Sequence, residues 1–235
     1  MASTDDRRTP LRRDARRNRE TLIAAARDIY AEHGVDAPLD VIARRAGVGN
    51  ATLYRHFADR AALVEAVFHD SLKPVLDAAR EARDREGDAW SILIAYLEQV
   101  FELLAADRGA GDLMTAAVQG VPTLDVLHAE NRETLQALVR RGQDQGTIRA
   151  DITVEDLLFL LAVLGRAAPA VPDAWRRCLA LVLDSLRPAA ARPLPAPPLG
   201  PEQFAAALSR LGGRPTTAPG RAHHPRPPAS EATTP

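Results

Sequence analysis

The sequence predicts an all-α protein of about nine helices. Alanine, leucine and arginine are abundant while aromatic residues make up only 4%, a composition that favours helices over strands. Apolar residues recur every three to four positions along much of the chain, and glycine and proline mark the turns between these periodic segments. With 46% hydrophobic residues among 235, the chain is long enough to bury a core in one or two domains.

Charge is distributed unevenly, although the formal net charge is only −1. Residues 1–60 carry 12 arginines and 9 acidic residues, whereas the remainder carries 18 basic and 22 acidic residues. A chain so close to neutral is not expected to coat nucleic acid indiscriminately. Its N-terminal part is nevertheless the expected face for a polyanion.

The cysteine count and the hydropathy pattern exclude several classes of protein. Cys178 is the single cysteine, so an internal disulfide and a cysteine-based zinc site are excluded. No signal-like apolar segment follows Met1, and no uninterrupted apolar run approaches twenty residues. We therefore expect a cytoplasmic protein that needs no membrane and no cofactor.

The first helix is expected over residues 16–33, because apolar residues repeat on one face and Gly34 ends the pattern. Residues 1–14 lack such periodicity and are expected to be a disordered basic arm. Two interpretations of the arm stay open: a solvated leader, or a segment that contacts nucleic acid phosphates or a minor groove. The arginines concerned are Arg7, Arg8, Arg12, Arg13, Arg16, Arg17 and Arg19.

Residues 42–57, with the sequence IARRAGVGNATLYRHF, read as a helix, a glycine turn and a second short helix. Leu39, Ile42 and Ala43 give the first helix one apolar side. Gly47 supplies the backbone torsion that a tight turn between two helices needs. The spacing therefore predicts two helices that cross at a corner.

The second of these helices begins at about Gly49 and is expected to bury Leu53 and Phe57. Its outer face is slim at the start and carries amide, hydroxyl, phenol, guanidinium and imidazole groups. A helix of this kind can enter the major groove of DNA, where such groups pair with base edges and phosphates. The segment therefore predicts a DNA-binding function.

This segment resembles the helix-turn-helix of TetR-family transcriptional regulators. The family's pattern is met at Ile42, Ala43, Ala46, Gly47, Val48, Thr52, Leu53, Tyr54, His56 and Phe57. The resemblance covers about residues 17–67, with further matches at Gly34, Val35, Asp59, Arg60 and Leu63. The sequence departs from the family at two places: Ala37 and Pro38 stand where a threonine is common, and Ala61 stands where an acidic residue is common.

The resemblance implies DNA contacts for individual residues. Base reading falls to Gly49, Asn50, Ala51 and Arg55, since asparagine can pair bidentately with adenine and arginine with guanine. Phosphate contacts are assigned to Thr52, Tyr54, His56, Arg60, Arg17 and Arg44. Two alternatives stay open: Tyr54 packs inside the small domain, and His56 merely caps its helix.

A fourth helix is expected after Asp59, a favourable N-cap residue. Arg60 lies at the positively polarised start of this helix, a place that suits a basic side chain better if a phosphate approaches. Pro74 interrupts the apolar pattern of Leu63, Val64, Val67 and Phe68 farther along, so we expect a kink or a break between two helices there.

A second helical domain is expected, with helices at residues 88–107, 111–119, 123–145, 154–168 and 172–186. Thr153 and Asp156 resemble a capping box. Residues 157–165 are apolar all round, so this helix must be covered on more than one side, either as a monomer's central helix or at a dimer interface. The family resemblance favours the interface, formed by Leu157, Leu161, Leu164, Trp175, Leu179, Val182 and Leu186.

The resemblance also implies a cavity for a small-molecule effector in this domain. Large or polar residues that could line it are Trp90, Tyr96, Phe101, Met114, Gln119, His128 and Phe159, although in any helical bundle they could be ordinary core. No metal site is expected, because Asp125 with His128 and His223 with His224 are only pairs of ligands.

We therefore expect four parts: the basic arm (1–14), a helix-turn-helix DNA-binding domain (15–60), a helical effector-binding and dimerisation domain (61–188) and a proline-rich flexible tail (189–235). The expected function is ligand-responsive repression by a homodimer on a pseudo-palindromic operator in double-stranded DNA. Activation remains the alternative. An enzyme would need a nucleophile, base or metal ligands at workable spacing, and a protein-binding adaptor would leave the polar helix after Gly47 unexplained.

Overall fold

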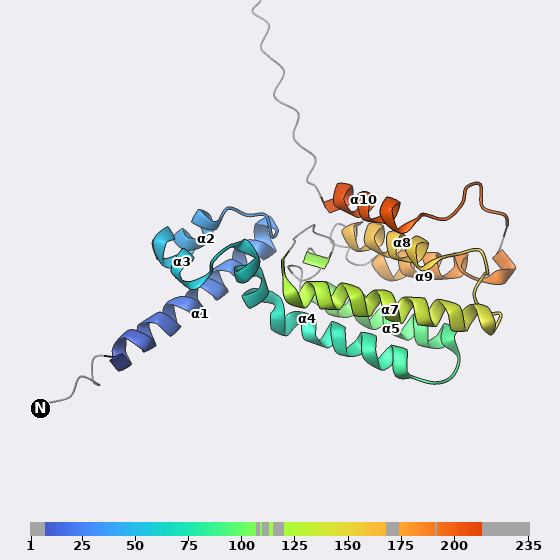
Figure 1. The fold of residues 1–235 in the computed structure, drawn as a ribbon, viewed down its shortest axis with the longest axis horizontal. Coiled ribbons are helices and arrows are strands. Elements are labelled where there is room, and N and C mark those ends of the chain that lie inside the picture. Colours follow the sequence, from blue (N-terminus) through green and yellow to red (C-terminus); the bar gives the residue numbers. More distant parts are fainter. Residues whose placement is uncertain are drawn as a thin grey trace, which may run out of the picture.

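The computed structural model describes residues 8–106, 109, 113–114, 120–167, 174–190 and 192–212. Within these ranges the chain forms nine α-helices and one short 3-10 helix, and no strand. Figure 1 shows two bodies, a small N-terminal bundle of α1, α2 and α3 and a larger bundle of α5, α7, α8, α9 and α10, joined by α4. The predicted all-α class is confirmed.

The N-terminal bundle consists of α1 (Arg8–His33), α2 (Leu39–Arg45), α3 (Asn50–His56) and the first turns of α4 (Arg60–Asp84). Apolar residues from all four helices form its core, among them Leu22, Ile29, Tyr30, Ile42, Leu53, Phe57, Leu63 and Phe68. The Tyr30 and Phe68 rings stack with their centroids 5.9 Å apart. This core fixes α2 and α3 on the side of α1.

Helix α1 begins earlier than expected. Residues 8–14 are helical and continue α1 outward, whereas the sequence predicted disorder for residues 1–14. The reason is local: a helix already formed over the core residues can extend into an arginine-rich segment, because arginine has a high helix propensity and extension needs no new nucleus. The remainder of the predicted arm lies outside the described residues.

Helix α4 runs without a break from the N-terminal bundle into the second domain, although Pro74 lies inside it. Of the two expected alternatives, a break between two helices is therefore wrong. Proline has no N–H, so Pro74 leaves the carbonyl of Asp70, four residues earlier, without its helical hydrogen-bond donor. Both residues are exposed. Water can satisfy that carbonyl, so the helix continues.

The second domain packs α4 against α5 (Ala89–Ala106) and α7 (Pro122–Asp144), with α8 (Val154–Ala167) and α9 (Trp175–Ser185) beyond them. Ion pairs from Arg80 and Arg83 of α4 to Glu130 of α7 mark the α4–α7 contact. The capping box before α8 is confirmed, because Thr153 and Asp156 exchange hydrogen bonds of 2.9 to 3.3 Å. The helix expected at 111–119 lies almost entirely outside the described residues.

Helix α5 is long and apolar enough to cross a membrane by length and composition alone. In this fold, however, it lies inside the bundle and contacts both α4 and α7. Eight of its residues are buried: Ala89, Trp90, Ile92, Leu93, Tyr96, Leu97, Val100 and Phe101. Its hydropathy is therefore that of a core helix.

Part of the predicted flexible tail is folded. A 3-10 turn (Pro188–Ala190) is followed by an extended segment and by α10 (Pro201–Gly212), which packs against α8. Buried Arg149 holds the start of this segment, since its guanidinium donates to the Arg192 carbonyl at 2.7 Å and pairs with Asp151. Residues beyond α10 lie outside the described part of the chain.

Candidate nucleic-acid interface

The turn between α2 and α3 is built as the sequence predicted. Gly47 has φ +68°, a left-handed conformation that side chains other than glycine adopt at a cost. Its N–H donates to the Arg44 carbonyl at 3.1 Å, and the Val48 N–H donates to the Ala43 carbonyl at 3.0 Å. These bonds satisfy the end of α2 and set the angle at which α3 leaves.

Helix α3 separates a buried side from an exposed one. Leu53 and the following Phe57 are buried in the N-terminal core. The solvent side presents Gly49, Asn50, Ala51, Tyr54 and Arg55, with Thr52 and His56 half-buried at its edges. All four residues predicted to read bases therefore lie on one exposed surface of a two-turn helix. We call this surface the α3 face.

The start of the α3 face is open. Gly49 has φ −76°, which any residue can adopt, and a Cβ added there would meet nothing within 4 Å. Backbone geometry and packing within the protomer therefore do not require glycine at this position. Gly49 is the N-cap of α3, a position that glycine fills more favourably than alanine, and it leaves the start of the helix free of a side chain.

Tyr54 and Arg55 present their side chains to solvent. Tyr54 is 55% exposed, so the alternative that it packs inside the small domain is wrong. The Arg55 guanidinium donates to the Thr52 hydroxyl at 2.8 Å, which joins a predicted base-reading residue to a predicted phosphate contact. His56 lies beside Phe57, with ring centroids 6.5 Å apart.

Arg60 has structural contacts within the protomer. Its Nη1 donates to the Val35 and Ala37 carbonyls, at 2.7 Å each, and so ties the start of α4 to the turn after α1. The guanidinium also lies near buried Tyr30, and although burial raises the pKa of Tyr30 to about 12, Arg60 opposes that rise. These contacts explain a basic residue at a helix start, and a phosphate contact by Arg60 stays a prediction.

The other predicted phosphate residues on α1 and α2 are exposed. Arg44 pairs with Asp40 one turn before it at 2.9 Å, and both side chains are largely exposed, so the pair contributes little and can exchange for a phosphate. Arg17 is exposed on α1. Sequence reasoning missed Arg19 as a positioned residue: its guanidinium carbon lies 5.1 Å from the centre of the Phe57 ring, a contact that no local pattern signals.

The predicted dimer residues fall into two groups. Five of them are buried within the protomer: Leu157, Leu164, Trp175, Leu179 and Leu186. Leu161 and Val182 are half-buried. The apolar side chains exposed on α8 and α9 are instead Leu160, Val163 and Leu181. The five buried residues pack below the surface on which a second copy would have to lie.

Three of the seven predicted effector residues fill the core. Trp90, Tyr96 and Phe101 are buried, and the Tyr96 hydroxyl donates to Asn131 at 2.7 Å. The Phe101 ring stacks on Trp175 at 5.7 Å. Met114 and Phe159 are half-buried, His128 is exposed, and Gln119 lies outside the described residues.

A cleft of about 230 Å³ lies instead between α5 and α9. Among its lining residues are Trp90, Ile94, Trp175, Leu179, Arg176 and Arg187, so it shares only Trp90 with the predicted set. Arg187 lies over the Trp90 ring at 4.1 Å and Arg176 over the Trp175 ring at 4.5 Å. Glu98 and Asp184 also line the cleft, so its apolar and aromatic walls are joined by charged groups of both signs.

Comparison with known proteins assigns both halves of the chain. A sequence model described as bacterial regulatory proteins, tetR family, matches residues 22–67, and one described as transcriptional regulator SbtR-like, C-terminal domain, matches residues 88–188. The uncharacterized HTH-type transcriptional regulator YvdT of Bacillus subtilis is 28% identical over 83 residues, which are 35% of this chain and 43% of YvdT. The chain thus matches less than half the length of this curated relative.

Solved structures extend the similarity. The TetR transcriptional regulator SCO0520 from Streptomyces coelicolor is 34% identical, with coverage of 72% of this chain and 98% of that one and a TM-score of 0.45. FadR from Bacillus subtilis, in complex with stearoyl-CoA, shares the fold with a TM-score of 0.55 at 17% identity, over 74% of this chain and 99% of that one. The two family models together match more than half of the chain, so the chain belongs to the TetR family of DNA-binding transcriptional regulators, which are not enzymes.

Proposed function

We propose that this protein is a cytoplasmic, ligand-responsive repressor that binds a pseudo-palindromic operator as a homodimer. The observation that carries the proposal is the α3 face, an exposed polar surface that begins at the unhindered Gly49. Such a helix fits a major groove, where Asn50 and Arg55 can pair with base edges. The bound dimer represses by occupying DNA that the transcription machinery needs.

The proposal of a dimer rests on the exposed apolar residues of the last helices. Leu160 and Val163 lie one turn apart on α8 and are 37% and 42% exposed, and Leu181 of α9 is 59% exposed. These three residues define the α8/α9 face. A second copy would cover it and would place two α3 helices on one operator, as a two-fold repeat of half-sites requires.

The proposed effector site is the cleft between α5 and α9. FadR, a protein of the same fold, forms a complex with stearoyl-CoA, which supports a ligand site in this type of helical domain. Trp90 and Trp175 line the cleft and are the two tryptophans of the chain. Their fluorescence therefore reports occupancy directly, and a compound that enters the cleft is expected to change their emission and release the operator.

The test of DNA binding is selection of duplexes from a random library by the purified full chain, at moderate and high salt. High salt screens non-specific phosphate binding, so the sequences that survive are those read by base contacts. We expect an inverted repeat whose half-sites are one helical turn apart, bound by two protomers. A folded protein that enriches no sequence would contradict the proposed function and would favour a protein-binding adaptor.

A further inference from the structure

We propose that the cleft between α5 and α9 binds an extended, uncharged molecule, an apolar chain whose head group carries a hydrogen-bond acceptor such as a carbonyl oxygen. The inference rests on the proposed function and deepens it, because it names the chemical class of ligand that the cleft takes. Three features of the cleft support it: a narrow shape, an indole N–H without an acceptor, and charges of both signs along the walls.

The cleft is long and narrow because two antiparallel helices form its walls. Trp90 at the start of α5 lies under Arg187, just past the end of α9, whereas Phe101 near the end of α5 stacks on Trp175 at the start of α9. From Trp90 to Phe101, α5 rises about 16 Å, so a volume of about 230 Å³ leaves a mean cross-section of only about 14 Å². Such a shape suits an extended chain better than a fused ring system.

The middle of the cleft is apolar. Ile94 of α5 lines one wall, and Leu179, Ala180 and Leu183 of α9 line the other. Leu179 and Leu183 are already buried in the protomer, while Ile94 is half-buried and Ala180 is exposed. Methylene groups placed between these walls would remove further apolar surface from water, which is favourable.

Trp90 provides a hydrogen-bond donor that has no acceptor. Only 6% of this residue is exposed, and its Nε1 is buried without a partner among the residues that the structure describes. Buried polar groups are nearly always hydrogen-bonded, because a missing bond costs free energy. Arg187 lies over the face of the ring, but a guanidinium has no acceptor to offer. An acceptor on a ligand would complete the hydrogen bonding of Trp90.

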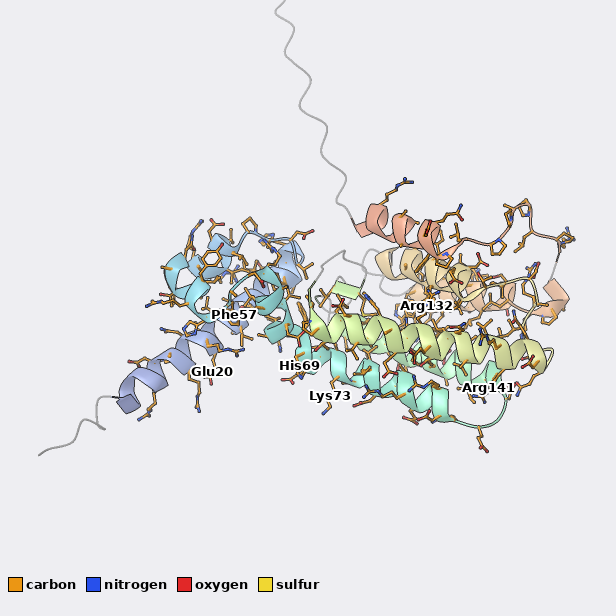
Figure 2. All side chains as sticks on the ribbon, viewed as in Figure 1. Glu20, Phe57, His69, Lys73, Arg132 and Arg141 are labelled. Atoms are coloured by element: carbon orange, nitrogen blue, oxygen red, sulfur yellow. The ribbon has the colours of Figure 1, made fainter. Side chains whose placement is uncertain are left out.

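The position of Trp90 is fixed by contacts from α7. Gln145 accepts a hydrogen bond from the Ala89 N–H at 2.9 Å and donates one to the Gly87 carbonyl at 3.1 Å. Arg141 donates to the same carbonyl at 3.3 Å, and Figure 2 shows Arg141 at the end of the bundle where the chain passes from α4 to α5. The start of α5 is therefore anchored, and the indole N–H belongs to a fixed part of the cleft wall.

The charges around the cleft favour an uncharged head group. Two carboxylates and two guanidinium groups line it: Glu98, Asp184, Arg176 and Arg187. Near Trp90, Arg187 follows Asp184 by one turn and also acts electrostatically on Asp88. An anionic head would meet two carboxylates and one guanidinium there, and a cationic head would offer Trp90 no acceptor. A neutral carbonyl group avoids both costs.

The experiment measures binding to the full chain without DNA. Three probes share one chain length: methyl octanoate has a neutral acceptor, octanoate is an anion, and octylammonium is a cation without an acceptor. These probes do not fluoresce, so tryptophan emission reports their binding. Trp90→Phe removes the N–H and keeps an aromatic ring, and the matched control Trp175→Phe makes the same change at the other end. Each variant retains one tryptophan as a reporter.

For the wild-type chain we expect methyl octanoate to bind most tightly of the three probes. Trp90→Phe should weaken the binding of this ester by about two- to tenfold, as the loss of one hydrogen bond predicts, whereas Trp175→Phe should change it by less than about twofold. Ala180→Phe places a ring in the middle of the cleft and should abolish binding of all three probes. Circular dichroism and sedimentation check that each variant is folded and assembled as wild type.

Tighter binding of octanoate than of the ester would overturn the inference, as would an ester affinity that Trp90→Phe leaves unchanged. Binding that survives Ala180→Phe would place the ligand elsewhere, and no binding of any probe would reject the cleft as a site for this class. None of these results bears on DNA selection. A chain that binds the ester as expected but selects no duplex would support the inference while the proposed function fails.

Discussion

Two glycines of the helix-turn-helix, Gly47 and Gly49, serve different purposes two residues apart. At Gly47 the backbone requires glycine, because φ is +68°. At Gly49 φ is −76° and the space where a Cβ would lie is empty. The left-handed backbone requires glycine at the first position. The second is the N-cap of α3, where glycine is favoured over alanine without being required, and we propose that it also gives DNA room to approach.

Replacing Gly49 by alanine separates folding from DNA binding. Because φ is allowed and nothing obstructs the methyl group, while alanine is a poorer N-cap than glycine, the free energy of unfolding should change by less than about 1 kcal/mol. Operator affinity should fall, since the methyl group stands where α3 approaches DNA. Chemical denaturation and anisotropy measure the two effects. The control Gly47→Ala should lose about 1 to 2 kcal/mol of stability, and a Gly49→Ala variant with unchanged affinity would remove Gly49 from the interface.

Arg60 offers a second test at the scale of a single residue. Arg60→Gln removes charge-assisted hydrogen bonds to the Val35 and Ala37 carbonyls, and should destabilise the protein by about 2 kcal/mol in urea unfolding. Arg44→Gln, which breaks only an exposed pair with Asp40, should change stability by less than about 1 kcal/mol. An unchanged midpoint for Arg60→Gln would mean that these hydrogen bonds do not stabilise the fold.

A cluster of polar contacts joins α4 to the start of α7. Glu65 of α4 accepts hydrogen bonds from the Thr123 N–H at 3.0 Å and hydroxyl at 2.5 Å, and His69 lies 3.1 Å from the same carboxylate. The carboxylate thus caps a helix that belongs to the other domain. Burial alone would raise the pKa of Glu65, but the bonds from Thr123 and His69 outweigh it and lower the pKa.

The lowered pKa of Glu65 predicts a pH dependence of stability. A carboxyl group whose pKa is lower in the folded state stabilises the fold above its unfolded pKa, about 4.3, and loses this contribution as pH falls through the folded value. Wild type should therefore lose unfolding free energy between about pH 5 and pH 3 more steeply than Glu65→Gln. Urea titrations across this range measure the slopes. Parallel slopes would mean that Glu65 does not contribute in this way.

At the scale of the whole molecule, the proposed dimer is expected to depend on the α8/α9 face. The double variant L160E/V163E places two carboxylates on that face, and burying them against a second copy would be costly, so the dimer should dissociate. Val126 of α7 is 46% exposed and provides the control V126E, which should remain dimeric. Sedimentation equilibrium measures both. A dimer that survives L160E/V163E would require another interface.

The sequence and the structure agree where a pattern is local and differ where distant residues meet. Gly47, the Asp59 cap and the Thr153–Asp156 capping box could be predicted, because each depends on residues within one turn. The role of Arg60 could not, since its acceptors are carbonyls 23 and 25 residues earlier. The contact of α10 with α8 and the cleft between α5 and α9 likewise arise from tertiary packing that no short window contains.

The unbroken course of α4 has a mechanical consequence. A helix of 25 residues is about 37 Å long, and the hydrogen bond lost at Pro74 makes that position the one where it bends most easily. If one end is held and the helix tilts by about 5°, the other end moves by roughly 3 Å, close to one base-pair step. Arg60 clamps the first turn of α4 to the helix-turn-helix. A small tilt of α4 within the second domain would therefore produce a larger displacement of the helix-turn-helix at its other end.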